Sequence, residues 1–293
     1  MSFNDDKQGK PISTSQTHIS PPRPLILGGT GRVGRMLAKL WPKDRATPLW
    51  QRRVGAGEVR ADDLIWDILT KSLPGVPDPI SAVIVLAGVT HGPVADLQHN
   101  TALAQAGVAL AHQLGVKTLV ASSQAVYGRQ TGALRETDTP APVTPYGQAK
   151  WDMEQAVGNN ENITCLRIGN VAGCGGLFQA MARGPIQIDQ FLDGQGPRRM
   201  MIGPRDLADV LATLSAAKST LPKVLNVANP HLIGMDAMAD AASVTWHWQP
   251  APNTALPVLA MDVAALCNHI ALPGATAADM IAQARAGGWK PAP

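Results

Sequence analysis

The sequence predicts an α/β fold, a doubly wound parallel sheet followed by a small carboxyl-terminal lobe. A short apolar run from Pro24 to Leu27 leads through a glycine-rich turn into a helical pattern. A later run, Ser81 to Ala87, is apolar after its first residue, as is typical of a strand buried on both faces of a parallel sheet, and Val116 to Ala121 is predicted to be the next buried strand. Helical segments alternate with these strands, which favours the α/β class.

The first 22 residues are polar and rich in Ser, Thr, Gln and Pro, so we predict a disordered tail over residues 1–22. They lack the apolar core of a signal peptide. No later stretch is apolar for long enough to span a bilayer, and we therefore expect no membrane partner.

The turn after the first strand carries glycines at every third position. Such glycines allow a tight turn, let the backbone approach a pyrophosphate and bring the following helix close to the strand, as in a Rossmann-type dinucleotide site. The anion would then meet the helix N-terminus. A plain turn is the alternative. The predicted cofactor-binding residues here are Gly28, Thr30, Gly31, Arg32, Val33 and Gly34.

The second predicted strand, Thr47 to Trp50, continues into Gln51-Arg52-Arg53, where many NAD sites present an acidic residue to the ribose. A guanidinium at this point favours the extra phosphate of NADP, so Arg52 and Arg53 are predicted to bind the cofactor, preferably NADP over NAD. The alternative is that both arginines are solvated. Asp67 and Ile68 are expected to end a third strand beside the adenine, although Asp67 is equally compatible with a helix cap or an exposed position.

Cofactor and substrate are expected at the carboxyl ends of the next two strands, where ligands bind in open α/β sheets. The first of these strands ends at Leu86-Ala87-Gly88, which should face the cofactor. A helix is predicted over residues 100–114. The strand after it delivers Ser122 and Ser123, and Ser123 can hold a substrate oxygen.

Tyr146 and Lys150 stand four residues apart and share one face of a predicted helix. An ammonium near a phenol favours its ionised form, which brings the pKa of Tyr146 closer to that of a useful acid/base catalyst. Ser123, Tyr146 and Lys150 are therefore the candidate catalytic residues. The alternative is a surface helix pair with Ser123 as a helix cap.

After a further strand at residues 162–168 the α/β alternation loosens. We predict an NAD(P)-binding Rossmann domain over residues 23–170 and a mainly substrate-binding lobe over residues 171–293, with some elements returning to the sheet. Trp246 to Trp248 is expected to be a strand of the lobe, with ligand stacking as the alternative. The other elements expected here are extended segments at 186–191 and 200–202 around a glycine turn, a helix at 205–217, a strand at 224–227 and a helix at 275–286.

Charge and cysteine content exclude several classes of function. The 25 basic and 22 acidic residues form no basic stripe, so no nucleic-acid partner is expected. The three cysteines lack CxxC spacing, which argues against a disulfide framework and a metal site and favours a reducing cytoplasm.

With these motifs in order, the chain from Pro24 onward resembles the extended short-chain dehydrogenase/reductase superfamily, and within it the NAD-dependent epimerase/dehydratase family typified by UDP-glucose 4-epimerase. The residues that carry the resemblance are the glycine turn, Ser122 to Gly128 and Tyr146 to Lys150. It implies that Ser123 is the catalytic serine, that Tyr146 is the acid/base, and that Lys150 binds the nicotinamide ribose. It also implies that Asn170 and Arg199 contact the diphosphate of a nucleotide-sugar.

Two departures from the family pattern narrow the expected reaction. Gln124 and Ala125 stand where the sugar-nucleotide dehydratases of this family carry Asp and Glu, so elimination of water lacks its proton carriers. Arg52 in place of an acidic residue favours exchangeable NADP(H), and hence a reductase over an epimerase.

The sequence therefore predicts an NAD(P)-dependent oxidoreductase or epimerase that exchanges hydride at a hydroxyl or carbonyl carbon of a sugar or nucleotide-sugar. A reductase of a non-sugar carbonyl is one alternative. A non-catalytic NAD(P)-sensing regulatory protein on the same fold is another. The sequence is compatible with a homodimer.

Overall fold

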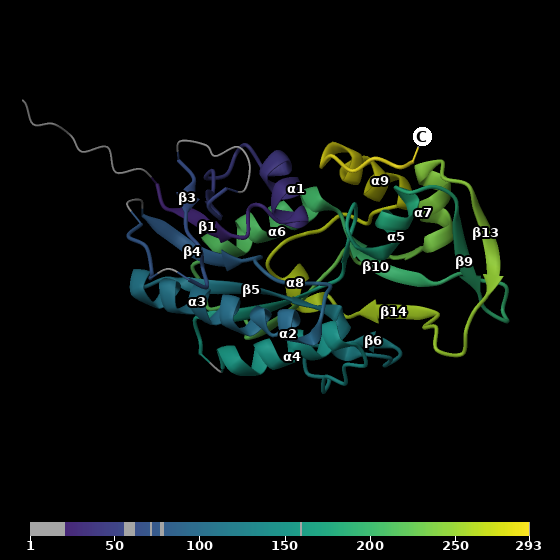
Figure 1. Ribbon diagram of the computed structural model, residues 1–293, viewed down its shortest axis with the longest axis horizontal. Helices are drawn as coiled ribbons and strands as arrows, with labels where there is room; N and C mark the ends of the chain where they lie inside the picture. The colour runs from purple at the N-terminus through teal and green to yellow at the C-terminus, as the bar shows by residue number, and fades with distance from the viewer. Residues whose placement is uncertain (1–20, 56–61, 71, 77–78, 159, 293) are drawn as a thin grey trace, which may run out of the picture.

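The computed structural model describes residues 21–55, 62–70, 72–76, 79–158 and 160–292. Residues 1–20, which make up most of the predicted disordered tail, lie outside this range. At its centre is a seven-stranded sheet with the order β11-β7-β5-β4-β1-β2-β3, in which every pairing is parallel (Figure 1). The strands are β1 (Arg23–Leu27), β2 (Leu49–Arg52), β3 (Leu64–Ile65), β4 (Ile80–Val85), β5 (Lys117–Ser123), β7 (Ile163–Ile168) and β11 (Val224–Val227).

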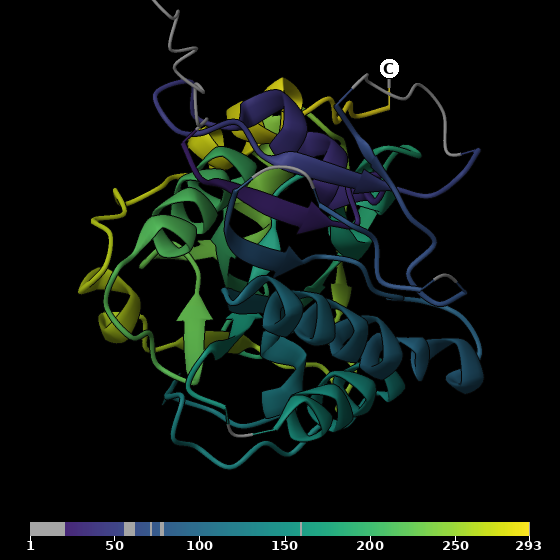
Figure 2. The same cartoon turned by 90° about the vertical axis from the view of Figure 1, so that its left-hand side faces the viewer.

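Helices cover both faces of this sheet (Figures 1 and 2). α1 (Arg32–Leu40) and α6 (Pro204–Ala216) lie on one face, and α3 (His99–Leu114) and α4 (Pro145–Val157) lie on the other. Successive strand residues point to opposite faces, so Ile26 packs with the first helix pair while Leu25 packs with the second. The predicted doubly wound α/β fold is confirmed.

The order of the strands reverses direction at the neighbours β1 and β4, because the chain moves outward to β2 and β3 before it returns to β4. A crevice forms outside the carboxyl ends of the strands at such a switch point. The glycine turn follows β1, and Leu86 to Gly88 follow β4. Both segments therefore meet at the crevice.

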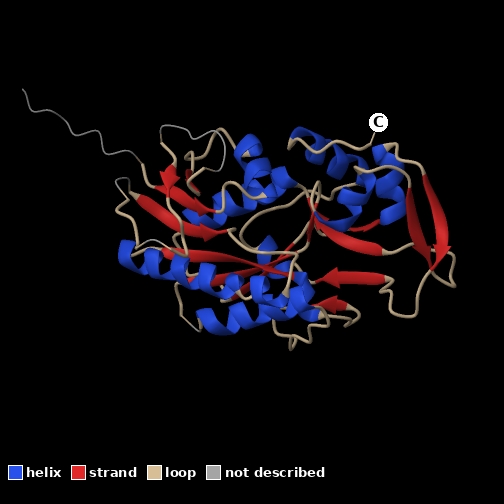
Figure 3. Ribbon diagram, in the orientation of Figure 1, coloured by secondary structure: helices blue, strands red, loops and turns tan. Residues whose placement is uncertain are grey.

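A smaller lobe continues from the carboxyl edge of the sheet, at the right of Figure 1. It contains a sheet of order β12-β10-β14-β6, in which β8 also pairs with β10, and a two-stranded β13-β9 sheet. Figure 3 shows its helices gathered on one side of these strands. The bounds are β6 (Ala133–Leu134), β8 (Asn170–Val171), α5 (Gly175–Met181), β9 (Ile186–Gln190), β10 (Arg198–Ile202), β12 (Leu232–Gly234), α7 (Met235–Ala242), β13 (Trp246–Pro250), β14 (Val258–Met261) and α9 (Ala277–Ala286).

Three short helices complete the described chain: α2 (Val94–Leu97), the 3₁₀ helix η1 (Gln124–Tyr127) and α8 (Ala264–Cys267). The extended segments 186–191 and 200–202 do not pair with each other across their glycine turn, because β9 pairs with β13 and β10 pairs with its own sheet. β3 is only two residues long, so Asp67 and Ile68 lie beyond it. Within the described ranges, the helices are too short or too polar to cross a bilayer.

Candidate active site

The glycine turn is closed tightly against the neighbouring strand. Gly28 has a φ of 98°, and a Cβ at this position would lie 2.5 Å from the backbone nitrogen of Ala87. The Gln51 side chain accepts a hydrogen bond of 2.9 Å from the Gly28 nitrogen, which fixes the turn to β2. Within the described residues, the α1 N-terminus has no side-chain cap, so its N–H groups are available to an anion.

One cleft runs along the carboxyl edge of the sheet. Its two compartments, of about 490 and 650 Å³, share Gly28, Gly31 and Arg32 on one side and Gly88 and Thr90 on the other. These volumes are in the range of known ligand sites. The predicted residues that line one or both compartments are Gly28, Thr30, Gly31, Arg32, Val33, Gly34, Arg53, Asp67, Ile68, Leu86, Ala87, Gly88, Ser123, Tyr146, Lys150 and Asn170.

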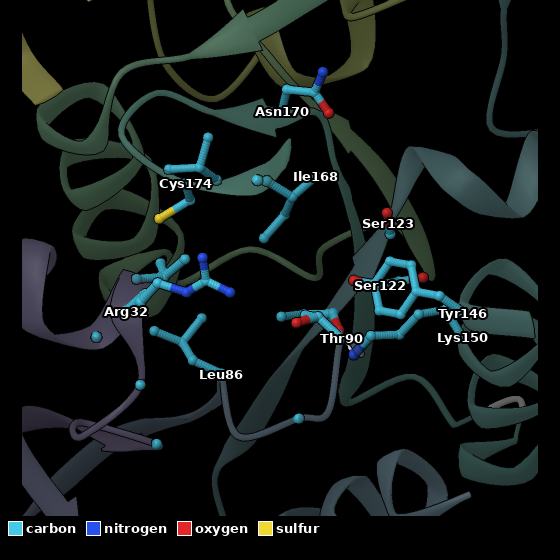
Figure 4. A pocket seen from close by; sticks show the side chains of 18 of the residues that line it. Arg32, Leu86, Thr90, Ser122, Ser123, Tyr146, Lys150, Ile168, Asn170 and Cys174 are labelled. Carbon is cyan, nitrogen blue, oxygen red and sulfur yellow. Dashed lines mark hydrogen bonds between the residues drawn. The ribbon is translucent and has the colours of Figure 1, made fainter. Parts of the chain in front are cut away.

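Tyr146 lies in the first turn of α4, directly against η1. Thr144 caps this helix by accepting from the Gly147 nitrogen at 3.0 Å, and Pro145 occupies its first position. A Cβ on Gly147 would lie 2.5 Å from the Ala125 carbonyl oxygen, so only glycine allows this approach. The close packing brings Tyr146 beside Ser123, and both side chains line the cleft (Figure 4).

Ser123 has two roles, because its Oγ also accepts a hydrogen bond of 3.2 Å from the Ala125 nitrogen and so caps η1. The structure is therefore compatible with both interpretations of Ser123, as a helix cap and as a residue of the site. In Figure 4, Ser123 and Tyr146 lie on one side of the cleft, and Arg32 and Cys174 lie on the opposite side.

The pKa of Tyr146 differs from the sequence-based expectation. Burial raises this pKa above its ordinary value of 10, and the hydrogen bond with Ser123 only partly opposes the shift. Lys150 does not lower it, because the Lys150 ammonium is directed to the Ala121 carbonyl at 2.8 Å and to Met153. Burial lowers the pKa of Lys150 itself to about 8, with Cys165 and Glu154 opposing this effect.

A buried ion pair anchors α4 one turn beyond Lys150. Glu154 and Arg167 of β7 form a salt bridge of 2.9 Å with side chains 4% and 3% exposed. Ser122, the neighbour of Ser123 on β5, donates its hydroxyl to the same carboxylate. The helix that carries Tyr146 and Lys150 is thus tied to the two strands beneath it.

Tyr127, the other tyrosine of the chain, has a structural position. Its ring is fully buried beneath the Arg167 guanidinium, which lies 4.8 Å from the ring centroid. The hydroxyl donates to Asn226 at 2.7 Å and accepts from Arg167 at 3.0 Å. Tyr127 therefore joins η1 to β7 and β11.

Asn170 enters the cleft from β8, a short strand of the lobe. Its Oδ1 accepts a hydrogen bond of 2.8 Å from Nε2 of Gln124. Gln124 follows Ser123 directly and is 6% exposed. This bond connects the serine turn of the main sheet with the lobe.

The structure does not bring Arg52 to the cleft, which corrects the prediction for this residue. Its guanidinium pairs with the Asp63 carboxylate, and that side chain is only 1% exposed. Arg53, immediately after β2, lines the larger compartment instead. The reason is that consecutive residues of an extended chain point to opposite sides.

Arg199 also lies away from the cleft lining. Its guanidinium donates to the carbonyl oxygens of Arg198, Pro257 and Leu256 at 2.7 to 3.2 Å, and burial lowers its pKa. These bonds join β10 to the segment before β14. Arg199 thus stabilises the lobe and is not among the residues that line the two compartments, and its predicted contact with a diphosphate stays a prediction.

The sequence argument missed several residues of the site. Asn100 is 1% exposed and bonds both backbone groups of Val89, which holds the segment after β4 beside Lys150. Thr90 and His91 line both compartments, and Cys174 lines the smaller one. A polar Asn inside an apolar helical pattern was the available signal for Asn100. The others lie in loops without periodicity.

Solved structures with the same fold include enzymes of nucleotide-sugar metabolism. MoeE5, solved with UDP-glucuronic acid and NAD, is 20% identical with a TM-score of 0.72, and the match covers 90% of this chain and 98% of that one. UDP-glucuronic acid 4-epimerase from Bacillus cereus, solved with UDP-glucuronic acid and NAD, is 17% identical with a TM-score of 0.71 over 90% and 98% of the two chains. TunA, an NAD-dependent NDP-hexosamine 5,6-dehydratase of tunicamycin biosynthesis, is 21% identical with a TM-score of 0.69 over 90% and 96%.

At these identities the similarity establishes the fold. No curated protein sequence matches the chain significantly. A sequence profile, by contrast, matches residues 24–228, which span the central sheet from β1 through β11. By this match the chain belongs to the NAD dependent epimerase/dehydratase family.

Proposed function

We propose that the protein is an NAD(P)-dependent enzyme that exchanges hydride at a hydroxyl or carbonyl carbon of a nucleotide-sugar, with Tyr146 as the acid/base. The observation that carries this proposal is that Ser123, Tyr146 and Lys150 line the same compartment as the glycine turn, which the second compartment shares. Membership of the family supports it.

The residues along the cleft fit a nicotinamide dinucleotide. The turn at Gly28 leaves no room for a side chain, and the uncapped N–H groups of α1 suit a pyrophosphate. Asp67 and Ile68 lie in the compartment suited to the adenosine half, and Lys150 lies in the compartment suited to the nicotinamide half. When bound, such a cofactor accepts or supplies hydride.

The protein residues handle the proton and the position of the substrate. With its pKa raised by burial, Tyr146 is a protonated phenol at neutral pH and is ready to donate to a carbonyl oxygen. In the opposite direction it accepts the proton of a hydroxyl, which requires the phenolate. We therefore expect oxidation to speed up as pH rises, while reduction stays nearly constant up to about pH 10. Ser123 holds the same substrate oxygen.

Relatives support a nucleotide-sugar as the substrate class. MoeE5 and the Bacillus cereus epimerase were solved with UDP-glucuronic acid. Asn170 supplies an amide on the lobe side of the cleft, where a diphosphate or sugar oxygen can accept a hydrogen bond. Gln124 and Ala125 supply no acid/base pair, so the proposal is an epimerase or a reductase, with dehydration excluded.

For the cofactor we propose a preference for NADP over NAD. This preference depends on Arg53 alone, because Arg52 is paired with Asp63. The guanidinium in the adenosine half of the cleft can bind a 2′-phosphate through charge-assisted hydrogen bonds. The solved relatives named above carry NAD, so this choice is specific to this chain. A preference for exchangeable NADP(H) favours net reduction over epimerisation.

The test is incubation of the protein with UDP-glucose, UDP-glucuronic acid and UDP-N-acetylglucosamine, with NAD(H) or NADP(H). Products are identified by NMR and mass spectrometry. We expect either inversion of configuration at one carbon, or oxidation or reduction of one hydroxyl or carbonyl carbon, which changes the mass by two hydrogens. A 4-keto-6-deoxy product would contradict the exclusion of dehydration. Tight cofactor binding without conversion of any sugar or simple carbonyl would instead identify a cofactor-sensing protein.

A further inference from the structure

Gln124 contains a buried polar atom without a partner. The side chain is 6% exposed, its Nε2 donates to Asn170, and its Oε1 has no hydrogen-bond partner among the described residues. An unpaired buried oxygen destabilises a folded protein, and an apolar residue of similar size would avoid this cost. Stability alone therefore does not explain a glutamine here.

The one hydrogen bond that the Gln124 side chain forms within the described part of the chain determines how the Asn170 amide is oriented. An asparagine amide has an acceptor end and a donor end. Because Oδ1 accepts from Gln124, Nδ2 remains as the donor that Asn170 can offer to a ligand. Rotation of the Asn170 amide by half a turn would place its Nδ2 group against Nε2 of Gln124 and break the bond.

The backbone on both sides of this bond is held in place. Gln124 begins η1, whose first N–H is capped by Ser123. Asn170 lies on β8, which pairs in register with β10 through Asn170 and Met201. The bond thus joins the serine turn directly to the lobe residue that lines the cleft.

We propose that Gln124 is a positioning residue for the substrate, which orients Asn170 so that its Nδ2 donates to an oxygen acceptor, such as the diphosphate of a nucleotide-sugar. This rests on the proposed function. The glutamine thereby has a role of its own in binding, at the position where related dehydratases use an acid.

Calorimetric titration of UDP into four proteins tests this role. We expect Gln124→Met and Asn170→Ala each to weaken UDP binding by about tenfold, since each removes the oriented hydrogen bond. The double variant should bind no more weakly than Asn170→Ala. Cofactor affinity should not change. The melting temperature of Gln124→Met should equal or exceed that of the unmodified protein, because the unpaired oxygen is gone.

A reversal variant sharpens the test. In Gln124→Glu the carboxylate accepts from Nδ2 of Asn170, which turns Oδ1 toward the phosphate, so UDP binding should weaken more than in Gln124→Met. The same substitution in the Asn170→Ala background measures the direct charge repulsion, which we expect to be the smaller effect.

The outcomes separate this inference from the proposed function. If the unmodified protein binds none of UDP, dTDP and GDP, the nucleotide-sugar function and the role of Gln124 both fail. If UDP binds and Gln124→Met leaves its affinity unchanged, or weakens it equally with and without the Asn170 side chain, only the role of Gln124 fails.

Discussion

The two sides of the cleft are built differently. On the side of Tyr146 and Lys150, the helix is anchored by a buried Glu154–Arg167 ion pair and by Ser122. On the lobe side, the Asn170 side chain has one hydrogen bond among the described residues, which it accepts from Gln124. A proton carrier must be held within a fraction of an ångström, whereas a binding residue tolerates small shifts. The ionic network thus lies behind the residues that we propose for the chemistry.

The two tyrosines give the sharpest contrast between a reacting and a supporting residue. Tyr146→Phe removes only the proposed proton carrier, so we expect turnover to fall by ~10² to 10⁴ while cofactor affinity stays nearly unchanged. Tyr127→Phe removes a hydroxyl of the buried network and should lower the melting temperature with little effect on turnover of the folded protein. Steady-state kinetics, cofactor titration and thermal unfolding check both. A Tyr146→Phe variant that retains most activity would remove Tyr146 from the mechanism.

The ion pair behind α4 should be among the most sensitive places in the molecule. Glu154→Gln leaves the buried Arg167 charge unpaired, and we expect a loss of about 3 to 5 kcal/mol in the free energy of unfolding. Asp152→Asn on the exposed face of the same helix is the matched control and should change stability by less than about 0.5 kcal/mol. Urea unfolding measures both. Equal small effects would show that the ion pair does not anchor the helix.

We expect Lys150 to destabilise the fold while it supports turnover and cofactor binding. The pKa of Lys150 is about 8 in the folded protein and ordinarily 10.5. Below about pH 8 the buried ammonium therefore lowers the free energy of unfolding by its full amount. Between pH 8 and pH 10.5 the folded protein releases the proton first, so the free energy of unfolding rises with pH. Lys150→Met should therefore weaken turnover and cofactor binding, yet increase the free energy of unfolding at pH 7 by about 1 to 2 kcal/mol. Unfolding curves between pH 7 and 10 check this. An identical pH slope in both proteins would contradict the assigned pKa shift.

The adjacent arginines at the end of β2 offer the comparison with the smallest and most specific expected effect. Arg53→Gln should lower the ratio of NADP to NAD affinity by about tenfold, because one charge-assisted contact to a phosphate is lost. Arg52→Gln should leave the ratio unchanged, since Arg52 is paired with Asp63 outside the cleft. Fluorescence titration of both cofactors at fixed salt separates them. If the unmodified protein prefers NAD, Arg53 is a solvated charge and the argument for a reductase loses its support.

The central sheet could be predicted because its signals are local. Pro24 to Leu27 and Ala82 to Ala87 are continuous apolar runs, and the spacing of Gly28, Gly31 and Gly34 is a constraint on the backbone itself. Ser123 and Tyr146 were found for a related reason, as they occupy ends of elements that a parallel sheet brings to one edge, whereas Asn170 was named only through the family resemblance.

Other features of the site and of the lobe depend on which side chains and strands pair with each other. The spacing of residues in the sequence does not reveal this pairing. The sequence alone does not distinguish Arg52 from Arg53. The extended chain points them to opposite sides, and the pairing with Asp63 places Arg52 on the side away from the cleft. The pKa of Tyr146 depends on burial and on where the Lys150 ammonium points. In the lobe, β9 pairs with β13, 60 residues away, a non-local contact without a pattern in the sequence.

The most direct test of the central claim follows the hydrogen bound to the reacting carbon. UDP-hexose carrying deuterium on the carbon of its reacting hydroxyl is incubated with cofactor and either the unmodified protein or Tyr146→Phe, and the label is located by NMR. The account predicts that the unmodified protein moves the label to the nicotinamide or returns it to an inverted carbon, and that Tyr146→Phe does neither at a comparable rate. Equal movement of the label in the two proteins, or no movement in either, would contradict it.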